Sequence, residues 1–336
     1  MSHELDFSKG QAAIAFRGAV PWHNLGNAIE PGDSLDTIMC KGGLEYDVER
    51  APARFDRKSF DAAGQPITTL STDPNTFILY RSDTGAPLSN CSPKYQVVQP
   101  REVINFYQDL TEKFGFEIEV VGALKGGRKV WALANTKNAF QLRGNDSVKG
   151  FLLFATSYDG TMSTQVRHTS VRVVCNNTIQ IAVQGKPEVS IPHSTKFDAD
   201  AVKRELKIGE AWEKFHAQAE QLQDRIVTRD ETIKLFMDAY YGLTSTDDIK
   251  AFQENPSNEK TAEKFMARMT EALFNSPGAH LASARGTLWG VLNAVTNDVD
   301  FSLPSRSNDT RFDKSQFGVG NQIKQRALTR ALAMVA

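Results

Sequence analysis

The chain has 336 residues, of which 40% are hydrophobic and 24% are charged, and its formal net charge is −1. These values are typical of a soluble globular protein with two domains, or with one large domain and an appended bundle. No apolar run approaches the roughly 20 residues that span a bilayer, and the polar N-terminus is not typical of a secretory signal. Three dispersed cysteines argue against a disulfide framework. We therefore expect a cytoplasmic protein without a membrane segment.

The first half of the chain is predicted to begin irregularly and then to form strands and a helix. Residues 1–60 are expected to be irregular because Pro and Gly interrupt them repeatedly. Residues 67–81 are typical of a strand, an Asp-Pro-Asn turn and a second strand. A helix is predicted to begin at Pro100 and to stop at Gly115, since five apolar residues between them share one face.

The apolar period changes to two after this helix, which predicts an antiparallel sheet. Lys125-Gly126-Gly127 and Asp159-Gly160 are typical hairpin turns between its strands. The strands are expected over residues 116–124, 128–135, 149–158 and 162–168. Residues 169–184 fit both a strand and a helix, and a helix is favoured because Thr169 or Ser170 supplies an N-cap.

The second half has helical spacing almost throughout. Helices are predicted over residues 199–227, 230–241, 246–253, 258–274, 280–296 and 321–335. A loop rich in Ser and Asn, with Pro304, is expected before the last of them. The predicted fold class is α+β: residues 1–196 form an antiparallel β-sheet with packed helices, and residues 197–336 form a mostly α-helical domain.

The charge of the chain is unevenly distributed. Residues 126–196, here called the basic segment, contain nine Lys or Arg and three Asp or Glu, which gives +6. Residues 1–125 carry −5 and residues 197–336 carry −2. A concentrated positive segment on a predicted sheet favours a surface that follows phosphates.

The basic segment supplies nine candidate nucleic-acid-binding residues. Six cations are expected to meet backbone phosphates, His168 lies in the Arg-His-Thr-Ser-Val-Arg run, and two aromatic residues are candidates for stacking on bases. These residues are Arg128, Lys129, Lys137, Lys149, Arg167, Arg172, His168, Trp131 and Tyr158. Two alternatives stay open: Arg167 and Arg172 pair with acidic groups of the N-terminal third, and Trp131 belongs to the core. Tyr158, beside a turn, is the better candidate for an exposed aromatic residue.

No pattern of catalytic residues is recognisable. Gly122–Lys129 fails the Walker pattern, because Arg-Lys stands where Lys-Ser/Thr is required and a strand, not a helix, follows. Histidines and cysteines show no metal-ligand spacing, and no nucleophile elbow occurs. We therefore expect a non-enzymatic protein without cofactor or metal.

Four runs of sequence together resemble a known family. They are YRSDTGAPLSNCSPKYQVVQPREVINFYQDL (80–110), VRVVCNNT (171–178), GTLWGVLNAVTNDVDF (286–301) and GVGNQIKQRAL (318–328). The chain resembles the phage/plasmid-like proteins grouped as a domain of unknown function, a resemblance that implies no catalytic residue. The predicted order of helix, antiparallel sheet and crossing helix is also similar to the core of phage single-strand annealing recombinases, which hold single-stranded DNA in rings or filaments without ATP.

These observations lead to a primary hypothesis: a non-enzymatic single-stranded DNA-binding and annealing protein of phage or plasmid recombination, acting as a ring or filament in the host cytoplasm. A second hypothesis is a phage or plasmid protein whose helical half binds a host protein, with no nucleic-acid role. A third is an enzyme whose site assembles from distant residues.

Overall fold

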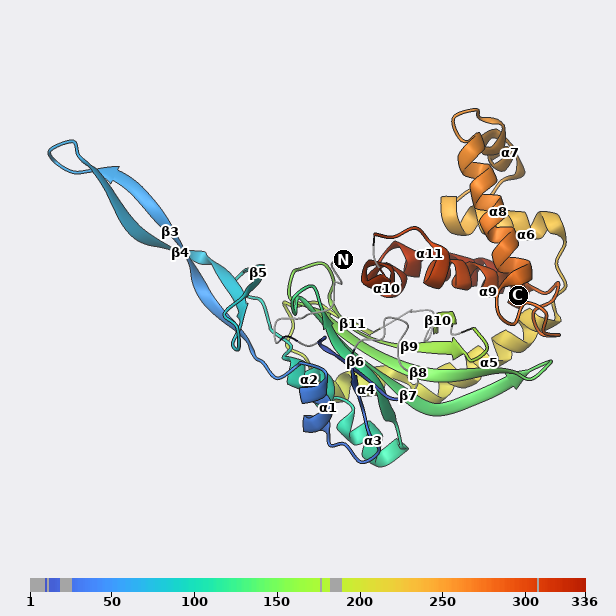
Figure 1. Cartoon of the computed structure of the whole chain (residues 1–336), viewed down its shortest axis with the longest axis horizontal. Helices are drawn as coiled ribbons and strands as arrows, with labels where there is room; N and C mark the ends of the chain where they lie inside the picture. Colours follow the sequence, from blue (N-terminus) through green and yellow to red (C-terminus); the bar gives the residue numbers. More distant parts are fainter. Residues whose placement is uncertain (1–9, 11, 19–25, 176, 182–188, 307) are drawn as a thin grey trace.

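A curved sheet forms the centre of the computed structural model, which describes residues 10, 12–18, 26–175, 177–181, 189–306 and 308–336 (Figure 1). In this described part the sheet has eight strands, in the order β10-β9-β8-β7-β6-β1-β2 with β11 also paired to β9. The strands are β1 Ile14–Phe16, β2 Asn27–Ala28, β6 Glu117–Leu124, β7 Lys129–Leu142, β8 Asp146–Ser157, β9 Thr164–Arg172, β10 Asn177–Ile181 and β11 Val189–Ile191. All pairs are antiparallel except β1–β2. The four strands predicted from the period of two and both hairpin turns are thus confirmed.

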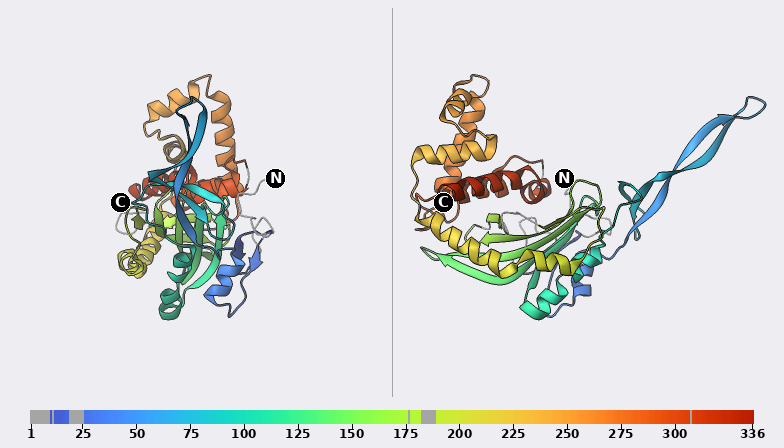
Figure 2. Two further views of the ribbon diagram at one scale, coloured as in Figure 1. Left: turned by 90° about the vertical axis from the view of Figure 1, so that its left-hand side faces the viewer. Right: turned by 180° about the vertical axis from the view of Figure 1, so that it is seen from behind.

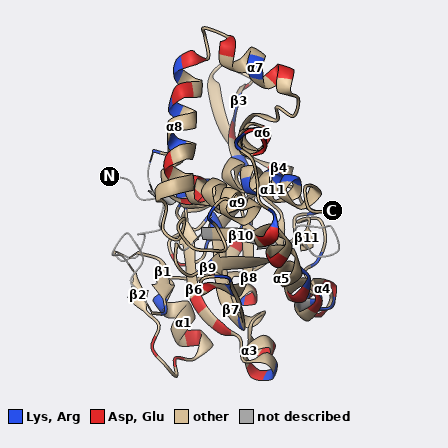
Figure 3. Ribbon diagram, turned by 90° about the vertical axis from the view of Figure 1, so that its right-hand side faces the viewer, with Lys and Arg blue, Asp and Glu red and all other residues tan. Residues whose placement is uncertain are grey.

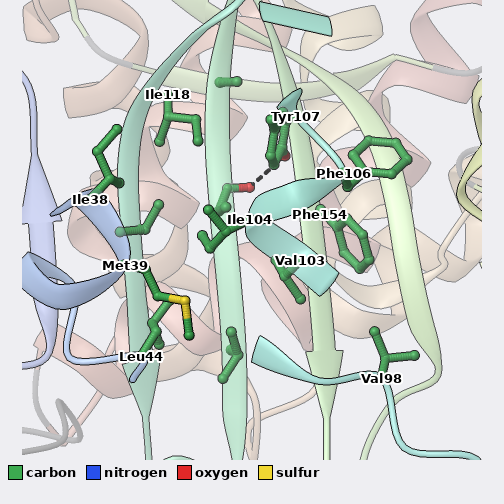
Figure 4. Close-up of a cluster of buried hydrophobic side chains, with 14 of the residues drawn as sticks. Ile38, Met39, Leu44, Val98, Val103, Ile104, Phe106, Tyr107, Ile118 and Phe154 are labelled. Atoms are coloured by element: carbon green, nitrogen blue, oxygen red, sulfur yellow. Dashed lines mark hydrogen bonds between the residues drawn. The ribbon is translucent and has the colours of Figure 1, made fainter. Parts of the chain in front are cut away.

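Four helices cover one face of this sheet and build a single core with it. They are α1 Leu35–Lys41, α2 Pro100–Asn105, α3 Gln108–Phe114 and α4 Ala199–Leu206. The buried Tyr107 hydroxyl lies 2.9 Å from the Ala132 carbonyl oxygen and 3.0 Å from that of Leu152, so it ties the α2–α3 junction to β7 and β8 (Figure 4). The predicted helix begins at Pro100 and stops at Gly115, whose φ of +68° favours glycine, but it is interrupted between α2 and α3.

Two predictions for the first half are wrong. Residues 67–81 do not turn back at Asp73-Pro-Asn: they belong to one strand, β4 Pro66–Arg81, paired with β3 Val48–Phe60, and the predicted turn is a bulge. Nor are residues 1–60 irregular throughout, since β3 falls within them. Pro74 is tolerated because a bulge requires no ladder hydrogen bond from it.

The β3–β4 ribbon projects far from the sheet, and the right-hand view of Figure 2 shows it standing clear of the body. With β5 Pro87–Cys91 it forms a three-stranded sheet at its base. The base is held by the fully buried Arg81, which donates to Asp83 (2.8 and 2.9 Å) and stacks on the Tyr46 ring at 3.9 Å. Residues 53–73 beyond this base, here called the distal arm, are mostly exposed. The ribbon is therefore anchored at one end and uncovered at the other.

Residues 169–184 form no helix in the part that is described. Strand β9 continues to Arg172, and β10 follows after a turn, because Lys149 and Val148 of β8 extend the ladder to Val171 and Arg172. Residues 176 and 182–184 of the predicted helix lie outside the described residues. Pairing of β9 with β8 and β10 thus determines the structure here, although Thr169 and Ser170 are suitable N-cap residues for a helix.

The C-terminal half is mostly helical, so the predicted α+β class is confirmed. Its further helices are α5 Ile208–Asp224, α6 Arg229–Tyr241, α7 Thr246–Glu254, α8 Glu259–Asn275, α9 Leu288–Asn297, the π-helix η1 Asp298–Ser302, α10 Asn308–Phe317 and α11 Val319–Ala333. The predicted helix 199–227 is broken at Lys207, where φ is +43°. The predicted helix 280–296 begins only at Leu288, and the predicted loop around Pro304 contains α10. None of the helices in the described part combines the length and hydropathy that crossing a bilayer requires.

The helical half is joined to the sheet through a buried carboxylate. Asp146, at the start of β8, accepts hydrogen bonds from Arg172 Nε (2.8 and 2.9 Å), Ser283 Oγ (2.6 Å) and Trp289 Nε1 (3.0 Å). Arg172 also donates to the Gly278 carbonyl oxygen at 2.9 Å. Both charged groups are at most 2% exposed, so this network fixes α9 and the loop before it against the end of the sheet.

We predict that Asp146→Asn lowers the free energy of unfolding by about 3–5 kcal/mol, because it leaves the buried Arg172 guanidinium without a counter-charge. Urea unfolding followed by circular dichroism measures this. Asp56→Asn, an exposed carboxylate on the distal arm, is the matched control and should have little effect. A loss below 1 kcal/mol for Asp146→Asn would contradict the prediction.

Candidate nucleic-acid interface

The nine candidate residues of the basic segment do not form one surface. Six of them are buried in the folded chain: Lys129, Trp131, Tyr158, Arg167, His168 and Arg172. Lys129, Trp131 and Arg167 lie on one face of the sheet, Tyr158 and His168 lie on the other, and Arg172 lies at the end of the sheet. The other three, Arg128, Lys137 and Lys149, are exposed at separate positions.

Helix α10 covers the three buried candidates on the face opposite α2 and α4. Asp313 of α10 lies 2.5 Å from Lys129 Nζ and 2.8 Å from Lys125 Nζ. Burial alone would raise the pKa of Asp313, but the hydrogen bonds from these two lysines outweigh it and hold the pKa below its ordinary value. The chain itself therefore supplies the anion that Lys129 meets.

The aromatic residues of α10 complete this cover. Phe312 packs on Trp131 with ring centroids 4.8 Å apart. The Phe317 ring receives Lys129 and Arg167, whose charged groups lie 5.5 and 5.3 Å from its centroid, and Arg167 also donates to the Gln316 carbonyl oxygen. Trp131 thus belongs to the core, as the alternative held, and its indole N–H has no hydrogen-bond partner among the described residues. Neither Trp131 nor Arg167 is presented to solvent.

The remaining buried candidates are held on the α2 and α4 face or at the end of the sheet. Tyr158 is fully buried and donates to the Val98 carbonyl oxygen at 2.9 Å, so the expectation that it is exposed is wrong. Burial raises its pKa well above the ordinary value. His168 Nε2 lies 3.2 Å from the Leu206 carbonyl oxygen of α4. Arg172 pairs with an acidic group, as the alternative held, but with Asp146 of the same segment and not with the N-terminal third.

The exposed candidates are dispersed. Arg128 lies in the β6–β7 turn and Lys149 in β8, and neither makes an ion pair with the described residues. Lys137 is half-exposed and pairs with Glu117. Of the other cations counted in the basic segment, Arg143 pairs with Asp224 at 2.6 Å, and Lys186 lies outside the described residues.

The distal arm is the exposed cationic and aromatic surface that the sequence reasoning missed. Along β3 the exposed side chains are both charged and aromatic: Arg54, Phe55, Asp56, Arg57, Lys58 and Phe60. Phe60 is 75% exposed and Phe55 is 53% exposed, while Leu70 across the ribbon is 64% exposed. The strand register places Leu70 opposite Asp56, on the same ribbon face as Arg54, Lys58 and Phe60. The signal was present in the alternation of residues 53–60 before the Asp-Ala-Ala-Gly turn.

No metal site is found among the described residues, where no three His, Cys, Asp or Glu side chains gather in a way that would hold an ion. Cys175 is buried, Cys91 is half-buried and Cys40 is exposed. Burial raises the pKa of the Cys91 thiol, which disfavours the thiolate.

Comparison with known proteins gives a family but no activity. The chain matches the model of a domain of unknown function (DUF932) over residues 87–316, more than half its length. This protein belongs to the DUF932 family. The predicted membership in a family of unknown function is thereby confirmed. No curated protein and no solved structure gives a significant match. The DUF932 match includes β5, strands β6 to β11 of the curved sheet and all of α10 except Phe317, and it leaves out β1, β2 and the β3–β4 ribbon.

We predict that His168 makes folding sensitive to acid. Burial lowers the pKa of His168 to about 4, although the Leu206 carbonyl opposes the shift. Between pH 6.5 and 4 the unfolded chain therefore binds a proton that the folded chain refuses, so this stability contribution is complete above pH 6.5 and is lost as the pH falls.

Between pH 7.5 and 4.5 the free energy of unfolding should therefore fall by about 2–3 kcal/mol less in His168→Gln than in the unaltered chain. Urea unfolding at each pH measures the difference, and the exposed His280→Gln provides the control. Equal pH dependence in His168→Gln and the unaltered chain would refute this assignment.

Proposed function

We propose that this DUF932 protein binds single-stranded DNA without catalysing a reaction and anneals complementary strands as an oligomer. The observation that carries the proposal is the distal arm, on which three exposed cations lie among two exposed aromatic rings, Phe55 and Phe60. Cations beside exposed rings suit a strand whose phosphates and unpaired bases are contacted together. We therefore assign DNA binding to the distal arm and not to the basic segment.

The arm can supply both contributions to binding. Arg54, Arg57 and Lys58 neutralise phosphates, while base stacking on an aromatic ring contributes about 1–3 kcal/mol per base. The arm also carries three aspartates, which balance its three cations, and Asp56 is exposed between Arg54 and Lys58 on the same face of the ribbon. The other two aspartates are held at the turn and at the bulge. Asp61 accepts hydrogen bonds from the Ala63 and Gln65 amides in the turn, and Asp73 accepts one from Asn75 in the bulge.

The geometry of the ribbon favours a projecting contact. Strand β3 has 13 residues, so at about 3.3 Å per residue the ribbon is about 40 Å long. It points away from the helical half, at the other end of the long axis (Figure 1). An element of this kind reaches DNA, or the DNA held by a neighbouring subunit, without displacing the body of its own chain. We further propose the cytoplasm of a phage- or plasmid-bearing host as the setting, and recombination as the process.

We expect the triple variant Arg54→Gln/Arg57→Gln/Lys58→Gln to bind a fluorescein-labelled 30-nucleotide oligo-dT at least tenfold more weakly than the unaltered chain at low salt. The slope of log K against log salt should fall by about 2, since three contacts to single-stranded DNA are lost. Fluorescence anisotropy at salt concentrations from about 50 to about 200 mM measures both the affinity and the slope.

The matched control removes three exposed lysines elsewhere, Lys214→Gln/Lys250→Gln/Lys260→Gln, and should bind as before. A second variant, Arg128→Gln/Lys149→Gln, tests the exposed remainder of the basic segment. Undiminished binding in the arm variant would exclude the arm, and no binding by the unaltered chain at low salt would exclude the function.

The aromatic residues of the arm should matter for annealing. In Phe55→Ser/Phe60→Ser the phosphate contacts stay, so the salt slope is retained while affinity falls roughly tenfold through lost stacking. Annealing of two complementary labelled strands, followed by fluorescence transfer, should slow in parallel. Mass photometry with and without DNA checks the oligomer: a monomer in both conditions would contradict assembly.

The second hypothesis, a host protein as partner of the helical half, also stays a proposal. It is favoured by one observation, an apolar groove in that half.

A further inference from the structure

A groove of about 670 Å³ opens between α6 and α8. Its inner wall is apolar and is formed by Phe236 of α6, Met266 and Leu273 of α8, and Val291 of α9. Phe274 stands at the lip with 68% of its side chain exposed. An exposed ring beside an apolar cleft is typical of a surface that buries an apolar partner.

The rim of the groove is positive. Arg229, His280 and Arg285 line it, all three are exposed, and none makes an ion pair with any described residue. No Asp or Glu is among the fifteen lining residues. Of the acidic residues at the start of α6, Glu231 is already held by Arg225 at 2.5 Å and by the Thr228 amide at 2.8 Å. Asp230, next to Arg229 in the chain, is exposed but does not line the groove, so the lining itself supplies no carboxylate to the rim arginines.

We propose that this groove binds an acidic and apolar peptide segment of another protein. Apolar side chains of the segment would fill the space between α6 and α8, while its carboxylates would meet Arg229 and Arg285 at the rim. This is the general way in which a short amphipathic segment is recognised in a helical groove. Complementary charge at the rim sets the orientation of the segment and the identity of the partner.

Charge also argues against two other occupants. The distal arm of a second copy carries three cations and three aspartates, so it brings no excess of negative charge to the rim. Single-stranded DNA would meet the rim cations through its phosphates, but aliphatic side chains such as Met266 and Leu273 in the interior suit apolar side chains better than polar base edges. The groove and the arm are therefore assigned different ligands.

The test is a selection of random 12-residue peptides displayed on phage, carried out on the immobilised full chain. The double variant Arg229→Glu/Arg285→Glu is selected in parallel, and Lys250→Glu/Lys260→Glu is the control. These two lysines are exposed on α7 and α8 outside the groove, where acidic and basic residues alternate along α8 (Figure 3). We expect peptides enriched in Asp or Glu and in Leu or Phe on the unaltered chain and on the control, but not on the rim variant.

The most enriched peptide is then synthesised with a fluorescent label and titrated. Binding should weaken at least tenfold in the rim variant and several-fold in Phe274→Ser, while the arm variant Arg54→Gln/Arg57→Gln/Lys58→Gln should bind it unchanged. Thermal unfolding confirms that the exposed substitutions leave the fold intact.

Four outcomes would overturn the proposal. Two of them are no enrichment over the rim variant and enrichment of neutral or basic peptides. Displacement of the peptide by oligo-dT, with equal loss of both ligands in the rim variant, would assign the groove to nucleic acid. Enrichment of peptides that match residues 53–73 would assign it to a second copy of the chain.

Discussion

The fold depends on one constraint: a carboxylate buried between two halves of the chain must be fully paired. Asp146 is inaccessible to solvent, and its acceptors are satisfied by Arg172, Ser283 and Trp289. Because an unpaired buried charge costs several kcal/mol, the sheet end and the loop before α9 are required to stay together. Gly290 lets this loop lie close against α9 itself, since a Cβ there would lie 1.8 Å from the Ala284 carbonyl oxygen.

The same requirement, that buried charges be paired, explains why most of the basic segment is not a binding surface. Its excess of positive charge reflects partners that are distant in sequence. Asp313 neutralises Lys129 across 184 residues, and the Gln316 carbonyl receives Arg167 across 149. Net charge per segment counts cations but does not tell whether a remote helix covers them. Only the three-dimensional pairing separates an internal ion pair from a binding surface.

The parts of the fold that sequence predicts are those decided by local chemistry. The period of two and the Gly-containing turns located β6 to β9 because each hairpin is formed by neighbouring residues. The failures arise where tertiary contacts decide. Helix α10 has the polar sequence NDTRFDKSQF and is ordered by packing on Trp131 and Lys129. The ribbon was missed because Pro52 and Pro74 suggest breaks, although the register shift at Pro52/Ala53 accommodates both.

The two proposed contact surfaces differ in their relation to the family. The groove residues, 227–291, lie within the DUF932 match at 87–316, whereas the distal arm lies outside it. The arm is anchored by Arg81 at its base, so its length and sequence can change without disturbing the core. Altering the groove is more costly, because Phe236 and Val291 also belong to the buried core of the helical half. A ligand of the groove is therefore the stronger candidate for a property shared across the family, and DNA binding by the arm for one that depends on this particular ribbon.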